Sequence, residues 1–361
     1  MSEMLVDGGV SEVTRELEAE VVCPLCGALA ELWVRGVQSA VEGESIDAYR
    51  CPGCDSVVSW PLRVPEGLYD AIYRNAAHLA GYSRYARYAR HCERADKPLE
   101  YLANQEDVYW AVAEVLARHP EARSWRIVEI GSGLGYLTAA LRAAGYDVTG
   151  IDISSEAIAE ARARFGPHYE HQNIFDPDDG FEGAFDFAIL LETIEHVPAP
   201  AAFLSAVTGL LAPGGSLLVT TPNRDAHPRD AHWRTDLPPV HLFWMTEAGV
   251  ERLGANLGYR TKFVDFTDFN RTHRQTVSLS DFNSTPPAIL DTTLRPRAKI
   301  PFRARVMERA RVYRPVAAAF RFVYDTARPR RARLTTRSFS LAAVMSPVRP
   351  PLPNDASTPT S

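Results

Sequence analysis

The stretch Val128-Glu129-Ile130-Gly131-Ser132-Gly133-Leu134-Gly135-Tyr136 decides the fold of this chain. It predicts a buried strand that runs into a glycine-rich turn, with a helix over residues 137–144 behind it. Glycine adopts backbone dihedral angles that other residues avoid, and its missing Cβ lets the main chain approach a ligand. A second predicted strand, residues 146–151, ends on Asp152, whose carboxylate is placed to accept hydrogen bonds from ribose hydroxyls. This βαβ layout is typical of adenosine binding.

The spacing of the glycines narrows the choice of ligand. Dinucleotide-binding turns follow the pattern Gly-x-Gly-x-x-Gly, which would require a glycine where this chain has Tyr136. Such turns also bring the N-terminus of a helix to a pyrophosphate. The tighter Gly-x-Gly-x-Gly pattern therefore favours an adenosine ligand without phosphate, such as S-adenosylmethionine.

Later segments carry two further motifs. An apolar strand at residues 185–191 leads into Glu192-Thr193-Ile194-Glu195-His196-Val197-Pro198, and Ala212-Pro213-Gly214-Gly215 turns the chain into another apolar strand. At these motifs the chain resembles the class I S-adenosylmethionine-dependent methyltransferases, most closely the ubiquinone-biosynthesis-like O-methyltransferases. The resemblance covers about residues 120–265. The alternative is a nucleotide-binding-like fold without activity.

Strands and helices alternate along the chain, which predicts an α/β domain with a mostly parallel sheet. The expected strands begin near Arg126, Asp147, His168, Phe185, Ser216 and Tyr259. The resemblance implies a Rossmann-like seven-stranded class I methyltransferase sheet, completed by a reversed strand at residues 337–345. An N-terminal zinc ribbon and helical appendages are expected beside it.

The resemblance also implies which residues contact the cofactor. Glu129 would lie near the methionine amino group, and Asp152 would bind the ribose hydroxyls. The full set of expected cofactor contacts is Glu129, Gly131, Ser132, Gly133, Gly135, Asp152, Ile153, Asn173, Ile174 and Leu191.

On the acceptor side we expect four catalytic residues: Glu192, Glu195, His196 and His241. The first three are spaced i, i+3 and i+4, so one helical turn would place them on a single face. In the family that the chain resembles, this cluster is associated with a divalent metal near the acceptor hydroxyl; the alternative is a brace for the turn, without metal. His241 is the expected general base, because imidazole titrates near neutrality. His227 and His232 are weaker candidates.

Four cysteines form two Cys-x-x-Cys pairs, Cys23 with Cys26 and Cys51 with Cys54, separated by 24 residues. This spacing predicts a zinc ribbon in which four thiolates hold one structural Zn²⁺ with no open coordination site. Disulfides are the rival interpretation, and they are rare in reducing compartments. We interpret the fifth cysteine, Cys92, as an ordinary partly buried residue.

We divide the chain into seven segments. They are a flexible N-terminus (1–18), the zinc ribbon (19–65), a helical lid or linker (66–118), the cofactor-binding methyltransferase core (119–267), an arginine-rich insertion (268–336), the last core strand (337–346) and a disordered tail (347–361). The helical segment is rich in tyrosine, and it either packs on the catalytic domain or covers the cofactor.

The insertion is strongly basic. Residues 295–337 hold fourteen basic and two acidic residues, although the whole chain has a formal charge of −6. Arginine binds phosphate and carboxylate through paired hydrogen bonds, so we hypothesise an anionic substrate or carrier. A solvated arm, or one that forms a homodimer, is the alternative. Replacing Arg328, Arg330, Arg331 and Arg333 with Gln should raise the substrate KM, and an unchanged KM would contradict the hypothesis.

Length and composition complete the expectation. A chain of 361 residues with 46% hydrophobic residues is long enough for one large domain with appendages. A basic-then-apolar leader and an apolar run of about 20 residues are both missing, which predicts a cytoplasmic protein without a membrane span. The expected function is O- or C-methylation of a small molecule, for example a nucleotide-linked sugar or another secondary metabolite. The alternatives are an RNA methyltransferase, which the acidic net charge disfavours, and a non-catalytic cofactor-binding partner protein.

Overall fold

The structure is a computed structural model that describes residues 20–79, 81–229, 237–277, 288–297 and 332–348. The predicted flexible N-terminus, nearly all of the predicted disordered tail and most of the arginine-rich insertion lie outside these residues. So do His232, Arg328, Arg330 and Arg331.

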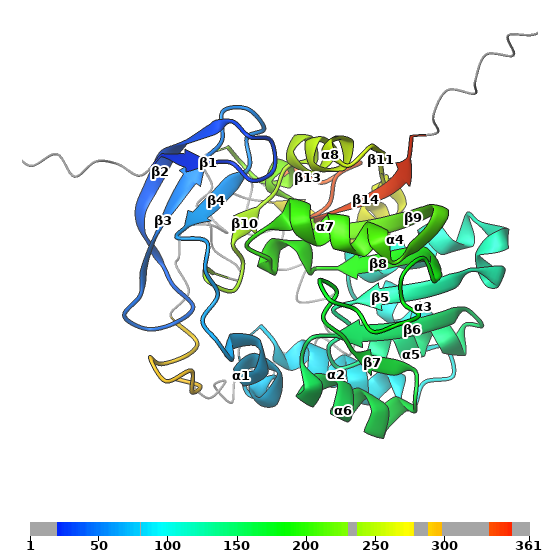
Figure 1. The fold of residues 1–361 in the computed structure, drawn as a ribbon. Helices are drawn as coiled ribbons and strands as arrows, with labels where there is room; N and C mark the ends of the chain where they lie inside the picture. Colours follow the sequence, from blue (N-terminus) through cyan, green and yellow to red (C-terminus); the bar gives the residue numbers. More distant parts are fainter. Residues whose placement is uncertain (1–19, 80, 230–236, 278–287, 298–331, 349–361) are drawn as a thin grey trace, which may run out of the picture.

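A seven-stranded sheet forms the centre of the catalytic domain (Figure 1). Its strands are β5 (Arg126–Ile130), β6 (Asp147–Asp152), β7 (Tyr169–His171), β8 (Phe185–Leu191), β9 (Leu211–Pro222), β11 (Tyr259–Phe263) and β14 (Ser340–Pro347). The spatial order is β11-β14-β9-β8-β5-β6-β7. Only β14 pairs antiparallel with both of its neighbours, and the pairs from β9 to β7 are all parallel. The predicted class I methyltransferase sheet with its reversed last strand is confirmed.

The helices of this domain are α5 (Tyr136–Ala143), α6 (Ser155–Phe165), α7 (Pro200–Gly209) and α8 (Glu247–Asn256). Side-chain caps fix two of their starts: Ser154 accepts a hydrogen bond from Ala157 N, and Thr246 accepts one from Gly249 N. The strand expected near Ser216 begins earlier, at Leu211, because the Pro-Gly-Gly turn is a bulge within β9.

The core lies on both faces of the sheet. On one face, Val128 and Ile130 of β5 belong to a hydrophobic cluster with side chains of α7 and α8. On the other face, Ile127 packs with side chains of α5 and of α4 (Asp107–Ala117). Strand β5 is therefore buried on both sides, as its apolar sequence requires.

The tyrosine-rich segment forms α1 (Leu68–Asn75), α2 (Ser83–Cys92), α3 (Pro98–Ala103) and α4. Helices α2 to α4 pack on the catalytic domain, where the hydroxyls of Tyr109 and Tyr136 lie 2.7 Å apart. Helix α1 lies beside α6 and the glycine turn (Figure 1). The two predicted roles of this segment therefore fall to different helices: α2–α4 pack on the domain, and α1 has the position that a cover requires.

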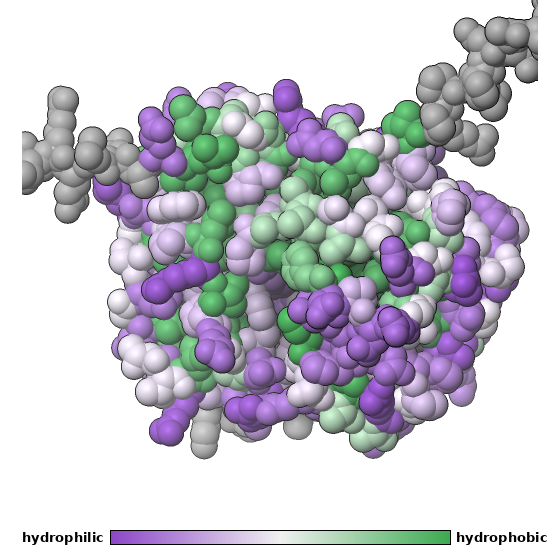
Figure 2. All heavy atoms as spheres, viewed as in Figure 1, coloured by the Kyte–Doolittle hydropathy of each residue, from purple (hydrophilic) through white to green (hydrophobic). Residues whose placement is uncertain are grey.

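The ribbon contains β1 (Val21–Val22), β2 (Leu29–Gln38), β3 (Ser45–Arg50) and β4 (Val57–Trp60). The sheet does not end with these strands, because β10 (Phe243–Trp244) pairs antiparallel with β4. Figure 2 shows hydrophobic residues over the ribbon, where Val22 and Leu29 are exposed, and hydrophilic residues around β6 and β7. Strand β10, from a later part of the chain, completes the ribbon's sheet.

Part of the insertion is described. Residues 288–297 lie against the ribbon and α1, and the fully buried Leu290 belongs to one hydrophobic cluster with Leu68 and Val240. Arg297 forms a 2.8 Å ion pair with Glu42. Two short strands, β12 (Thr276–Val277) and β13 (Ala332–Arg333), pair at the two ends of the insertion.

Among the described residues, none of the helices has the length and apolar character that a membrane crossing needs.

Candidate active site

The glycine turn is tied to the neighbouring strand by its own backbone. The amides of Gly131 and Ser132 both donate to the carbonyl of Ile151, at 2.8 and 3.0 Å. Gly131 has a φ of 75°, and a Cβ there would lie 2.8 Å from the hydroxyl oxygen of Thr193. Glycine is required here because the turn closes against the end of β8.

Asp152 occupies the carboxyl end of β6, as predicted for a ribose ligand. Its two oxygen atoms accept hydrogen bonds from the amides of Gly133 and Ser154, at 2.9 and 2.8 Å. Burial raises the pKa of Asp152, and these two amide donors oppose that rise. Beside it, the Ile153 side chain is 67% exposed, and Asn173 is also exposed. An exposed isoleucine at this edge offers an apolar surface for an adenine ring, in keeping with its predicted role.

Glu129 is buried below the turn and accepts a hydrogen bond from the hydroxyl of Thr138. Burial raises its pKa to about 8, despite the opposing effect of the Thr138 hydroxyl. In the folded protein without ligand this side chain is therefore a neutral acid below about pH 8. A cationic group at this position would favour the ionised carboxylate.

Gly135 has a packing role in the structure. A Cβ on this residue would lie 2.7 Å from both the Ala161 Cβ and the Tyr169 ring. The Tyr169 hydroxyl donates to the carbonyl of Gly135 at 2.6 Å. This glycine brings the turn into contact with α6 and β7, and its direct contact with the cofactor stays a prediction.

Helix α1 covers the turn with a tyrosine. The Tyr73 ring lies so near Gly133 that a Cβ on the glycine would be 3.2 Å from it. The helix is held there by a 2.7 Å hydrogen bond from Ser154 to Asp70 and by a 2.6 Å ion pair between Arg74 and Glu156. Neither Tyr73 nor its partner Tyr69 was predicted from the sequence. Their i, i+4 spacing, which places both on one helix face, was the available signal.

Three of the four predicted catalytic residues lie together. The side-chain atoms of Glu195, His196 and His241 that could bind a metal ion are all within 4.8 Å of one another. His241 Nε2 is 3.8 Å from Glu195 Oε1, and the ring centroids of His196 and His241 are 4.6 Å apart. Glu195 is 0% exposed and His241 is 5% exposed, so solvent screens this interaction weakly.

The backbone around these residues is fixed by several hydrogen bonds. His196 Nδ1 donates to the Val240 carbonyl at 2.7 Å, which leaves Nε2 as the basic nitrogen of that ring. The Tyr69 hydroxyl lies 3.3 Å from the His196 carbonyl and 3.1 Å from the Val240 carbonyl. Burial and the negative charge of Glu195 raise the pKa of Tyr69, so its hydroxyl keeps its proton and donates. Helix α1 therefore contacts this cluster as well as the glycine turn.

Glu192 does not share a helical face with the other two, so that prediction is wrong. Strand β8 ends at Leu191, and the only helical turn here is the short 3-10 helix η2 (Ile194–His196). Glu192 has a φ of 49°, a backbone conformation that residues with a Cβ rarely adopt. Among the described residues, Glu192 is not part of the group formed by Glu195, His196 and His241. Its catalytic role stays a prediction. His227 packs on Trp244, with the ring centroids 5.2 Å apart.

The four ribbon cysteines form a second cluster. Their sulfur atoms lie within 4.8 Å of one another, with Cys23 and Cys54 3.8 Å apart and Cys26 and Cys51 3.3 Å apart. The two knuckles repeat one backbone pattern: Gly27 N bonds to Cys23 O, and Asp55 N bonds to Cys51 O. In each knuckle the residue after the second cysteine has a positive φ: 78° for Gly27 and 60° for Asp55.

These sulfur distances separate metal binding from disulfides. A disulfide needs about 2.05 Å between sulfur atoms. Tetrahedral zinc with Zn–S bonds of about 2.3 Å places neighbouring sulfur atoms about 3.8 Å apart. All described cysteines are free thiols, and burial raises the pKa of Cys92 to about 12, as expected for an inert residue.

Comparisons with known proteins agree with this architecture. A family model described as a methyltransferase domain matches residues 85–262. A ubiquinone biosynthesis O-methyltransferase from Aromatoleum aromaticum is 36% identical over 105 residues, which are 28% of this chain and 45% of the relative. One from Thiobacillus denitrificans is 32% identical over 157 residues, 42% of this chain and 65% of the relative. The chain thus spans about half the length of the curated relatives it matches.

The solved structures that match the chain are more distant in sequence. A possible histamine N-methyltransferase from Thermotoga maritima is 16% identical, with a TM-score of 0.43 over 77% of this chain and 99% of that one. A 1,6-didemethyltoxoflavin-N1-methyltransferase from Burkholderia thailandensis is 16% identical, with a TM-score of 0.40 over 70% of this chain and 94% of that one. The residues matched by the family model contain the glycine turn and the parallel strands around it, so this region is similar to methyltransferase domains and has the class I S-adenosylmethionine-dependent methyltransferase fold.

Proposed function

We propose that this protein is an S-adenosylmethionine-dependent methyltransferase that acts on a hydroxyl or an acidic carbon of a small molecule. The observation that carries the proposal is the buried Glu195–His196–His241 cluster. It lies directly after β8, and the Thr193 hydroxyl within the same turn bonds to the Ile130 carbonyl at the start of the glycine turn. An acid/base group is thereby close to the expected cofactor site.

The residues around the turn fit the cofactor. Asp152 would bind the ribose, Glu129 the methionine ammonium, and Ile153 one face of the adenine. When bound, the sulfonium supplies an activated methyl group for an in-line displacement. The tasks left to the protein are alignment of the acceptor and removal of its proton.

His241 suits the second task. Its imidazole can take the proton from the acceptor, and the Glu195 carboxylate, 3.8 Å from Nε2, stabilises the imidazolium that forms. Burial of both groups strengthens this electrostatic effect. Positioned bases of this kind contribute about 10²- to 10⁴-fold to rates.

A divalent cation is the competing arrangement for the same cluster. One carboxylate and two imidazoles are a ligand set that suits transition metals. His196 offers Nε2, because Nδ1 is engaged with the Val240 carbonyl. Metal analysis after dialysis against a chelator separates the two arrangements: activity that survives with less than about 0.1 ion per cluster assigns the chemistry to His241.

We also propose that Cys23, Cys26, Cys51 and Cys54 hold one structural Zn²⁺. The sulfur spacing fits the ion, and four protein ligands leave no position for water or substrate. The ribbon alone has a small core, so metal binding would contribute directly to its folding.

The acceptor is proposed only by class. The basic charge of residues 295–337 supports an anionic small molecule such as a nucleotide-linked sugar. An RNA acceptor is the alternative that this basic segment also permits, and its binding would weaken steeply with salt.

The test uses methyl-labelled S-adenosylmethionine, the full chain and an extract of the source cells divided into small-molecule, RNA and protein pools. We expect label in the small-molecule pool, lost with His241→Ala and kept with His119→Ala. His119 is the matched control because it is half exposed and lies beside η1 (Pro120–Ser124), which precedes β5. Label in RNA would overturn the acceptor class, and no label in any pool would overturn the activity.

A further inference from the structure

The ribbon contacts the catalytic domain through a shared sheet. Strand β10 pairs with β4 in the register Phe243 to Val58 and Trp244 to Val57. The Ser59 amide extends this ladder by donating to the Leu242 carbonyl at 2.9 Å. Since Leu242 directly follows His241, the ribbon ladder begins one residue after the proposed base.

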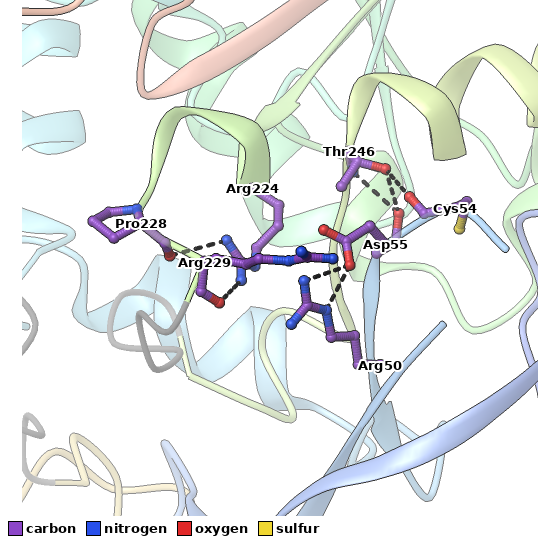
Figure 3. A network of polar contacts seen from close by, with 8 residues as sticks. Arg50, Cys54, Asp55, Arg224, Pro228, Arg229 and Thr246 are labelled. Atoms are coloured by element: carbon purple, nitrogen blue, oxygen red, sulfur yellow. Dashed lines mark hydrogen bonds and ion pairs between the residues drawn. The ribbon is translucent and has the colours of Figure 1, made fainter. Parts of the chain in front are cut away.

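Side chains next to a cysteine knuckle add a second connection (Figure 3). The Thr246 hydroxyl donates to the Cys54 carbonyl at 2.5 Å, and the Thr246 amide donates to the Ser56 hydroxyl at 3.1 Å. Thr246 and Ser56 are both buried. The end of the β10 segment is therefore attached to the residue that would carry a zinc ligand.

A buried arginine packs on Trp244 of β10. Arg224, which is 2% exposed, has its guanidinium 4.8 Å from the centre of the Trp244 ring. It donates to the carbonyls of Pro228, at 3.2 Å, and Arg229 (Figure 3). Trp244 thus packs between side chains of the ribbon sheet and Arg224, which follows β9.

The catalytic side of the segment is equally constrained. The Leu242 amide donates to the Glu195 carbonyl at 2.8 Å, and the Val240 carbonyl accepts from His196 Nδ1 at 2.7 Å. The backbone of residues 240–242 is therefore held between the ribbon and the Glu195 turn. In contrast, the glycine turn bonds to β6 and contacts α1.

We propose that the metal-loaded ribbon is a positioning element for the acceptor half of the site, holding His241 in register with Glu195. This inference rests on the proposed function of His241. Loss of the metal should loosen residues 237–246 while the cofactor half still binds S-adenosylhomocysteine. A displacement of about 1 Å at a catalytic group can lower a rate about 100-fold, so a small change in strand register is sufficient.

Two variants test the inference. Cys26→Ser removes the only partly exposed ligand, in the knuckle that is not bonded to Thr246. Ser56→Ala keeps all four ligands and removes the hydroxyl that bonds to the Thr246 amide. Arg35→Ala is the matched control, because Arg35 is an exposed ribbon residue on β2.

For each protein the measurements are zinc content, hydrogen exchange of residues 237–246, S-adenosylhomocysteine affinity and kcat. Cys26→Ser should lose zinc, exchange faster at 237–246 and lose at least about tenfold in kcat, with cofactor affinity changed less than about threefold. Ser56→Ala should keep zinc and show a smaller change in the same direction. Arg35→Ala should match the wild type.

Two results would overturn the proposal. One is zinc loss with unchanged exchange at 237–246, which would make the ribbon an independent module. The other is zinc loss that abolishes cofactor binding as well, which would make the ribbon a general part of the core. If the wild type transfers no methyl group, the proposed function fails, and the exchange and affinity measurements still decide whether the ribbon holds this segment.

Discussion

The two halves of the site are built in different ways. Apart from Leu191, the expected cofactor contacts come from one continuous stretch, residues 126–174, in which each strand, turn and helix follows the previous one. The acceptor half combines η2, residues 237–246, helix α1 and the ribbon strand β4, which are far apart in the chain. Local sequence patterns therefore specify the first half, whereas only tertiary pairing assembles the second.

Each half also treats its buried charge differently. Glu129 in the cofactor half is buried next to a hydroxyl, and its pKa rises to about 8. Glu195 in the acceptor half is buried next to an imidazole. A cationic ligand would favour ionisation of Glu129, whereas Glu195 already has a cationic partner when His241 is protonated.

The largest expected effect concerns Glu129 and the stability of the cofactor half. A folded pKa of about 8 above the usual 4.5 means that stability is full below pH 4.5 and is lost as pH rises towards 8. At about 1.36 kcal/mol per pH unit, the loss is at most about 5 kcal/mol. Glu129→Gln should remove this slope in denaturant unfolding measured from pH 4.5 to 9, and exposed Glu251→Gln should keep it. Equal slopes in wild type and Glu129→Gln would contradict the raised pKa.

His241→Ala tests the acceptor half alone. Because a positioned base is removed, kcat should fall about 10³-fold. The affinity for S-adenosylhomocysteine, measured by calorimetry, should stay within about twofold, since His241 lies beside Glu195 and His196 in the acceptor half. A loss of cofactor affinity comparable to the loss of kcat would show that the halves are not separable.

Asp152→Ala should give the reverse pattern. The variant loses two amide-to-carboxylate hydrogen bonds and the expected ribose contact, so cofactor affinity should fall about 100-fold. At saturating cofactor, kcat should change only a few-fold. Asp147→Ala, at the exposed opposite end of β6, is the control and should bind normally. Normal cofactor binding by Asp152→Ala would remove this residue from the site.

Tyr69→Phe should have the smallest effect, because it removes one hydroxyl that bonds to the His196 and Val240 carbonyls. We expect a loss of about 1 kcal/mol in unfolding free energy and about fivefold in kcat. Tyr259→Phe, on the edge strand β11, should change neither quantity. An unchanged kcat in Tyr69→Phe would mean that α1 does not support the catalytic cluster.

Sequence reasoning predicted the sheet, the glycine turn and the cysteine cluster, because each depends on local spacing. It also selected Glu195, His196 and His241, which the structure brings together. It failed for Glu192, since a helical spacing was assumed where strand β8 ends in a residue with positive φ. It missed the pairing of β10 with β4, because two apolar residues carry no signal for a partner about 185 positions away.

Helix α1 contacts both halves through residues four positions apart. Tyr73 covers the glycine turn, and Tyr69 bonds to the carbonyls of His196 and Val240. A rigid two-turn helix cannot move away from one of these contacts without disturbing the other. A displacement of α1 at the glycine turn would therefore also displace Tyr69 from the carbonyls of His196 and Val240, so this helix couples the two halves of the site.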